Sequence, residues 1–103
     1  MTSPALLAIL DDEARIERAH KDLIDLTRES LKRAAFAFKV GCDRIAEQLI
    51  DVALCLDTAE DQLGIDGENY IDAAEAFVSA GLSIIDAHLD AVRIEARIRG
   101  VHA

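Results

Sequence analysis

Residues 42–64 read CDRIAEQLIDVALCLDTAEDQLG, and the apolar side chains of this stretch recur in alternating steps of three and four. The recurring positions are Cys42, Ile45, Leu49, Val52, Leu56, Ala59 and Leu63. This spacing sets them in one row along an α-helix, as a buried seam between helices requires. Asp43 can cap the start of the helix, and Gly64 occupies the position favoured for a left-handed C-terminal cap. The pattern predicts a helix over residues 43–63.

The segment before this helix predicts a longer one. Ser3 followed by Pro4 is a helix start, because the Ser side chain can cap free N–H groups and Pro at the first helical position loses no hydrogen bond. Neither Gly nor Pro follows until Gly41, and a row of Ile9, Ile16, Leu23 and Ser30 recurs at every seventh position. We expect one helix over residues 4–40, about 50 Å long. A kink in it would instead allow a compact four-helix monomer.

The segment after residue 64 predicts a third helix. Asp66-Gly67 forms the centre of a short turn, and a helix follows over residues 69–99. Gly100 closes this helix, after arginines that complement the negative end of the helix dipole. Its expected apolar face comprises Tyr70, Ala74, Phe77, Val78, Gly81, Leu82, Ile85, Leu89, Val92 and Ala96. The sequence therefore predicts an all-α fold of three antiparallel helices, long, short and medium in length, in a single domain over residues 1–103.

The unequal helix lengths predict apolar ends that one chain cannot cover. A middle helix of about 21 residues returns along the first helix only to residue 20 or so, and the last helix overshoots the middle one at the opposite end. Apolar residues make up 51% of the chain, a high share for so small a helical protein. We expect a homodimer in which each chain covers the other's overhangs. The expected dimer seam comprises Leu6, Ile9, Ile16, Leu23, Leu89 and Val92.

The charge distribution limits the classes of partner. The net charge is −9, and residues 45–92 carry eleven acids with no Lys or Arg. This balance argues against direct contact with nucleic acid, which needs clustered cations, and against an anionic membrane surface. No apolar stretch approaches the roughly 18 residues that span a bilayer, and the N-terminus lacks the features of a secretory signal. We expect a cytoplasmic protein that does not enter or bind membranes.

The regional acidity has three interpretations. It can be a solvated surface that keeps Ala-rich helices from aggregating, a docking surface for a basic protein, or a mimic of a nucleic-acid backbone. The second predicts that the partner's on-rate depends on salt. We assign the partner face to Glu47, Asp51, Asp57, Glu60, Asp61, Asp72, Glu75, Asp86 and Asp90.

One short motif offers a metal-binding alternative. Glu17 and His20 form an E-x-x-H pattern, and Glu13 lies one turn earlier, so three possible metal ligands share one helical face. Ferritin-like di-iron bundles use this arrangement, but with two E-x-x-H motifs and two further Glu residues. Here His88 follows Ile85 at the corresponding spacing. The competing interpretation is that His20 lies at the edge of the core.

A second alternative is enzymatic. Arg28 and Lys39 are 11 residues apart, which places both cations on one side of the first helix. With His88 and the long, short and medium helix order, this arrangement resembles the all-helical chorismate mutases, intertwined dimers that hold a dicarboxylate between basic side chains. The resemblance implies a site made of Arg28, Lys39 and His88, the last in place of a family Gln. The adjacent Arg and Glu that the family has on its middle helix are not matched, because this helix offers Glu47 and Asp51 instead.

Taken with the charge pattern, these features favour a small acidic helical-bundle protein of the interaction or regulatory class. We expect it to act through protein–protein contacts, without catalysis and without a cofactor. The expected partners are a second copy of the chain and a basic protein.

Overall fold

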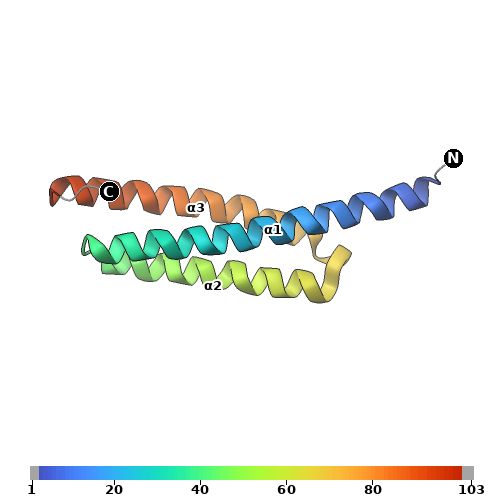
Figure 1. Ribbon diagram of the computed structural model, residues 1–103, viewed down its shortest axis with the longest axis horizontal. Coiled ribbons are helices and arrows are strands. Elements are labelled where there is room, and N and C mark those ends of the chain that lie inside the picture. Colours follow the sequence, from blue (N-terminus) through green and yellow to red (C-terminus); the bar gives the residue numbers. More distant parts are fainter. Residues whose placement is uncertain (1–2, 101–103) are drawn as a thin grey trace.

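The computed structural model describes residues 3–100, and every regular element in that range is helical (Figure 1). The elements are α1 (Pro4–Lys39), α2 (Asp43–Asp66), the short 3-10 helix η1 (Gly67–Asn69) and α3 (Ile71–Ile98). The all-α prediction with three long helices is confirmed. None of the helices within residues 3–100 combines the length and apolar character that crossing a bilayer requires.

The first helix begins as the sequence predicts and is unbroken over 36 residues. The Ser3 hydroxyl accepts a hydrogen bond from the Leu6 N–H at 3.2 Å, and Pro4 is the first helical residue. The helix ends at Lys39, and Gly41 adopts φ +82°, a left-handed conformation that glycine tolerates without strain. The continuous helix excludes the kinked four-helix alternative.

Both ends of α2 differ from the expected helix. The residue before it is Cys42, whose side chain makes no capping hydrogen bond, and Asp43 is the first helical residue. At this position the Asp43 carboxylate interacts favourably with the positive N-terminal end of the helix dipole. The helix continues through Gly64 to Asp66, because an interior glycine costs only about 1 kcal/mol, and Gly67 at φ +54° ends it. The predictions that Asp43 caps the helix and that Gly64 ends it are therefore wrong.

The chain reverses at each connection, so that α2 returns alongside α1 and α3 runs beside both (Figure 1). Two contacts fix the register of α1 and α2: the Ser30 hydroxyl donates to the Leu49 carbonyl oxygen, and His20 Nδ1 lies 3.1 Å from Glu60 Oε1. The buried side chains form one apolar core along the three helices. Its largest fully buried members are Leu23, Leu49, Leu56, Leu63 and Val92.

The end of α3 lies near the turn between α1 and α2, where the Arg99 guanidinium donates to the Val40 carbonyl oxygen at 2.8 Å. The C-terminal end of α3 projects slightly past this turn (Figure 1), so the predicted overshoot of the last helix is present but short. Leu89 and Val92 are only 9% and 1% exposed, and of the predicted overhang only Ile98 is uncovered, at 74%. The helix reaches no further because it begins beside the first third of α1.

The other end of the bundle has the uncovered segment that the helix lengths predict. Residues 3–11 are all exposed, and the N-terminal end of α1 projects past the turn between α2 and α3 (Figure 1). We call residues 4–11 the N-terminal arm. Its large apolar side chains, Leu6, Leu7, Ile9 and Leu10, are 47–55% exposed. Ile9 borders a hollow beside the end of α2, and the other three side chains line none of the hollows in the described chain.

Candidate functional site

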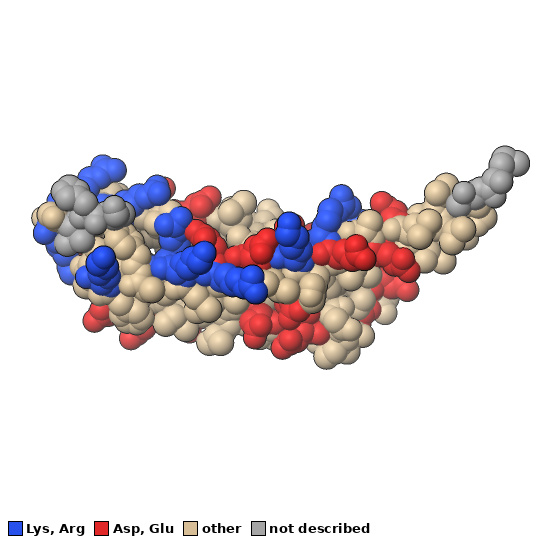
Figure 2. All heavy atoms as spheres, in the orientation of Figure 1, with Lys and Arg blue, Asp and Glu red and all other residues tan. Residues whose placement is uncertain are grey.

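The outer side of α1 carries a row of cations. At about 100° per residue, Lys21, Arg28, Lys32 and Lys39 all lie roughly opposite the helix face that buries Leu23. In Figure 2 the Lys and Arg side chains gather along the middle of this view, with groups of Asp and Glu beside them. The surface around α1 is therefore charged, with both signs present.

The nine residues of the expected partner face do not form one surface. Asp57, Glu60 and Asp61 lie together on the edge of α2 beside α1, with their carboxylate oxygens within 4.8 Å of one another. Asp72, Glu75, Asp86 and Asp90 share the edge of α3 that lies on the opposite side of α1. Glu47 and Asp51 point outward from α2, and Asp51 lines a hollow between α2 and α3. The structure thus separates the acids into three groups.

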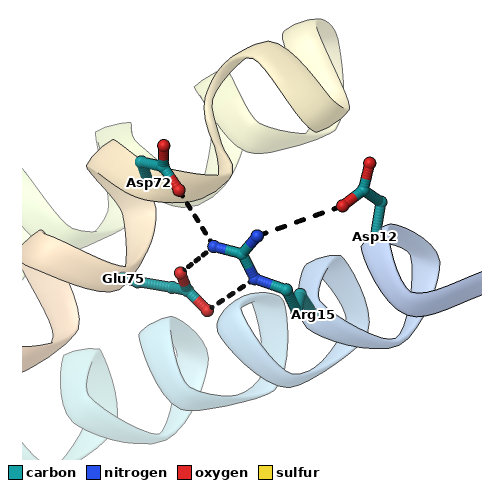
Figure 3. A network of polar contacts seen from close by, with 4 residues as sticks. All are labelled: Asp12, Arg15, Asp72 and Glu75. Carbon is teal, nitrogen blue, oxygen red and sulfur yellow. Dashed lines mark hydrogen bonds and ion pairs between the residues drawn. The ribbon is translucent and has the colours of Figure 1, made fainter. Parts of the chain in front are cut away.

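Two of the acidic side chains on α3, Asp72 and Glu75, are paired with Arg15 of α1 (Figure 3). The Arg15 Nε donates to one Glu75 carboxylate oxygen at 3.2 Å, and its Nη2 donates to the other and to Asp72 Oδ1, the latter at 2.9 Å. Asp12 adds a fourth charge at 3.9 Å. These contacts raise the pKa of Arg15 and lower the pKa of Glu75, in each case mainly through the hydrogen bond between them. This guanidinium stays charged and joins two helices, which is a structural role.

The three expected metal ligands are not brought together. His20 pairs with Glu60 of α2, while Glu13 and Glu17 are exposed, and Glu13 lines a separate hollow beside the turn that follows α2. Within residues 3–100 the group of possible ligands that does converge is Asp57, Glu60 and Asp61. Their carboxylates are suited to a hard cation such as Ca²⁺ or Mg²⁺, but all three come from one helix and would leave most of the coordination shell to water.

The three residues that the enzymatic resemblance implies are also apart. Arg28 and Lys39 point away from the core on the outer side of α1. The His88 ring lies on the other side of the core, where Nδ1 is 2.8 Å from the Ile84 carbonyl oxygen and Nε2 is 3.0 Å from Gln48 Oε1. Within one chain these groups therefore face different sides of the bundle.

The side of the molecule away from α1 is apolar. A hollow of about 280 Å³ between α2 and α3 is lined by Asp51, Val52, Cys55, Leu56, Phe77, Ala80, Gly81 and Ile84. A second hollow of about 260 Å³ is lined by Leu54, Cys55, Thr58, Ala59, Tyr70 and Phe77. Because the two share Cys55 and Phe77, they form one continuous depression, which we call the α2–α3 groove.

Beside this groove, α3 presents a row of apolar residues that the sequence analysis missed. We call it the outer seam, and it consists of Ala73, Phe77, Ala80, Ile84, Ala87, Ala91, Ile94 and Ile98. The steps between its members alternate between four and three, and none of them is buried. The spacing is visible in the sequence, but half of the positions are alanine, and the sequence pattern places Phe77 on the inward face.

No protein-family model matches the chain, and neither a curated protein nor a solved structure matches it. Its function must therefore be inferred from its surfaces. These are the two acidic edges beside α1, the N-terminal arm, and the apolar side formed by α2 and α3.

Proposed function

We propose that this chain is a small acidic interaction protein, regulatory in kind, that acts through protein–protein contacts and not through catalysis. In this proposal three antiparallel helices form a bundle that a second copy completes, and a basic protein docks on the acidic edge of α2. One observation carries the proposal. Within residues 3–100, thirteen large apolar side chains are at least 40% exposed in the folded chain.

Exposed apolar surface on this scale favours association. Full burial of one Leu, Ile or Phe side chain contributes about 1.5–3 kcal/mol relative to exposure. Scattered apolar residues are ordinary on a protein surface, but contiguous ones mark contact sites. Here they are contiguous in two places, the N-terminal arm and the side formed by α2 and α3. Both places suit a protein partner.

The acidic edge of α2 supports the second part of the proposal. Asp57, Glu60 and Asp61 bring three carboxylates together, and His20 is the basic side chain paired with one of them. A Lys or Arg side chain from a partner would relieve the repulsion among these carboxylates. Contacts of this kind raise the association rate and weaken as salt screens them.

The first experiment measures the mass of the protein in solution by light scattering after size-exclusion chromatography, from 1 to 100 μM. We expect twice the 11.2 kDa of the single chain in the upper part of this range. A monomer at every concentration would contradict self-association.

The second experiment tests docking with a Lys-rich helical peptide as the probe and a Glu-rich peptide of equal length as the control. We expect the parent protein to bind the Lys-rich peptide and the triple variant Asp57→Lys, Glu60→Lys, Asp61→Lys to bind it at least tenfold more weakly. A matched variant, Asp86→Lys with Asp90→Lys, changes acids on the edge of α3 and should bind within about threefold of the parent. Equal binding by the parent and the triple variant would remove the α2 edge as a docking site.

A further inference from the structure

We propose that the outer seam of α3 packs against the outer seam of a second copy, with the two α3 helices running in opposite directions. This inference rests on the proposed self-association and names the surface and the orientation that produce it. The occupant of the α2–α3 groove is then the α3 helix of the partner copy.

The spacing of the outer seam is the first argument. Alternating steps of three and four keep side chains in one row against a neighbouring helix, and such rows are the contact surface of coiled coils. Another row on α3, which includes Ile71, Ala74, Ile85 and Val92, already packs against the core of its own chain. The outer seam has the same helical spacing but no cover, since Phe77, Ile84, Ile94 and Ile98 are 40–74% exposed.

The shape of the surface is the second argument. The α2–α3 groove runs beside the outer seam, and Ile84, Phe77 and Ala80 belong to both. Side chains from a facing helix could enter the two hollows of this groove, as knobs enter holes in a helical interface. The alanines of the seam would let the two backbones approach closely. Within the groove the charged side chain is Asp51, at its rim.

The charges at the two ends of the outer seam favour this orientation, although Asp86 and Asp90 lie on the same flank and oppose their counterparts near its middle. At about 100° per residue, Asp72 near the start of α3 and Arg97 near its end both flank the same side of the seam. Full overlap of two opposed α3 helices puts Arg97 of one copy close to the level of Asp72 in the other. The Asp72 side chain is 96% exposed although it accepts a bond from Arg15, so it can accept a second cation. In a parallel pair the same flanks of the two seams lie on opposite sides of the interface, so Asp72 of one copy would not meet Arg97 of the other.

The available area is sufficient for a stable pair. From Ala73 to Ile98 the outer seam is about 39 Å long, and with α2 alongside the apolar side is roughly 20 Å across. This corresponds to about 800 Å² per copy, the size of an ordinary specific interface. The charges around α1 stay on the outside of such a dimer, where solvent screens the repulsion between two chains of net charge −9.

The first test compares two substitutions of exposed residues of similar size on α3. Ile84 lies in the outer seam and is 41% exposed, whereas Leu82 is 51% exposed and lines a hollow between α1 and α3. We expect Ile84→Gln to raise the dimer dissociation constant at least 30-fold and Leu82→Gln to change it less than threefold, as measured by sedimentation velocity. Circular dichroism checks that both variants keep the helical content of the parent.

The second test measures orientation in the dimer. A spin label is attached to Ala73→Cys in a chain whose own thiols are removed by Cys42→Ala and Cys55→Ser. Opposed helices place the two labels about 35–40 Å apart, because they lie at opposite ends of the overlap, whereas parallel helices place them within about 15 Å. A short distance in the pulsed electron spin resonance experiment would overturn the proposed orientation.

The outcomes separate this inference from the proposed function. A parent protein that stays monomeric up to 100 μM removes self-association and the inference with it. The dimer could instead persist in both Ile84→Gln and Ile94→Gln and dissociate when Leu7 and Leu10 are changed to Ser. That result would support self-association but place the contact on the N-terminal arm. Binding of the monomer to phosphatidylcholine vesicles that Ile84→Gln abolishes would assign the apolar side to a lipid surface instead.

Discussion

The Ser30 hydroxyl donates a 2.6 Å hydrogen bond to the Leu49 carbonyl oxygen on the neighbouring helix, and neither residue is exposed to solvent. The bond joins two residues that are 19 positions apart in the chain. It is possible because a small side chain at position 30 lets α1 and α2 approach closely. Ser30 continues the seven-residue spacing of Ile9, Ile16 and Leu23, so a polar residue here occupies a core position.

We expect Ser30→Ala to lower the free energy of unfolding by about 1 kcal/mol, because it removes a buried hydrogen bond without creating a large cavity. Ser30→Leu should cost more, about 1–3 kcal/mol, since its side chain would force the two helices apart. Urea denaturation followed by circular dichroism measures both. Ser79→Ala, at an exposed position on α3, is the control and should stay within about 0.5 kcal/mol of the parent. Equal stability of the parent and Ser30→Leu would contradict close packing at this point.

The two helical glycines should respond to alanine in opposite directions. A Cβ at Gly64 would meet no atom within 4 Å, so Gly64→Ala should stabilise the protein by about 0.5–1 kcal/mol through helix propensity. A Cβ at Gly81 would lie 2.9 Å from Leu56 Cδ2, whose side chain is only 1% exposed. We expect Gly81→Ala to destabilise by about 1 kcal/mol, since overpacking exceeds the propensity gain.

A double variant checks the cause of the Gly81 effect. Adding Leu56→Val to Gly81→Ala shortens the side chain that the new methyl group meets. The two changes should then cost less together than the sum of their separate effects in thermal and urea denaturation. Strict additivity would show that the contact with Leu56 is not the reason.

Helix periodicity and end signals were enough to predict the three helices, because Ser3, Pro4, Gly41 and Gly100 act through local backbone geometry. They failed at Gly64, where a local preference for a helix end of about 1 kcal/mol was not decisive. The position along α1 at which α3 begins could not be predicted from local sequence signals either. It coincides with an ion-pair network between Arg15 and the first turns of α3, and such a contact depends on tertiary structure.

The surfaces were predicted less well than the helices, because the surface that a side chain joins depends on how the helices pack. Charge counted along the chain suggested one acidic face, but neighbouring acids on a helix point in different directions, and α1 separates the edge of α2 from that of α3. Leu23 and Val92 were assigned to a dimer seam, and the chain itself buries them. The outer seam was overlooked because its alanines carry little weight in a search for large apolar residues.

The stability contributed by the pair between Arg15 and Glu75 should depend on pH. Arg15 lowers the pKa of Glu75, so the folded protein keeps this carboxylate ionised at pH values where the unfolded chain protonates it. The contribution is complete above the ordinary Glu pKa of about 4.3 and is lost as the pH falls through the lowered pKa of the folded state. Glu75→Gln should therefore lower the urea midpoint at pH 7 and differ less from the parent near pH 2.5.

Salt and a matched variant complete this test. Because the pair is exposed, 0.5 M NaCl should reduce the difference between the parent and Glu75→Gln at pH 7. Glu47→Gln removes an exposed carboxylate from α2 and should not reproduce the pH dependence. A difference between the parent and Glu75→Gln that grows on acidification would contradict the assigned direction of the pKa shift.

Removal of the N-terminal arm separates folding from association. The side chains of residues 3–11 are exposed, so deletion of residues 1–11 should leave the stability of the monomer within about 0.5 kcal/mol of the parent. The comparison is made in the Ile84→Gln background at low micromolar concentration, where we expect monomers. The deletion brings the new N-terminus to Asp12, and Arg15 with the buried Ala19 remains in place. A loss above about 1 kcal/mol would mean that the arm is covered by its own chain in solution, which would remove it from the surfaces available to a partner.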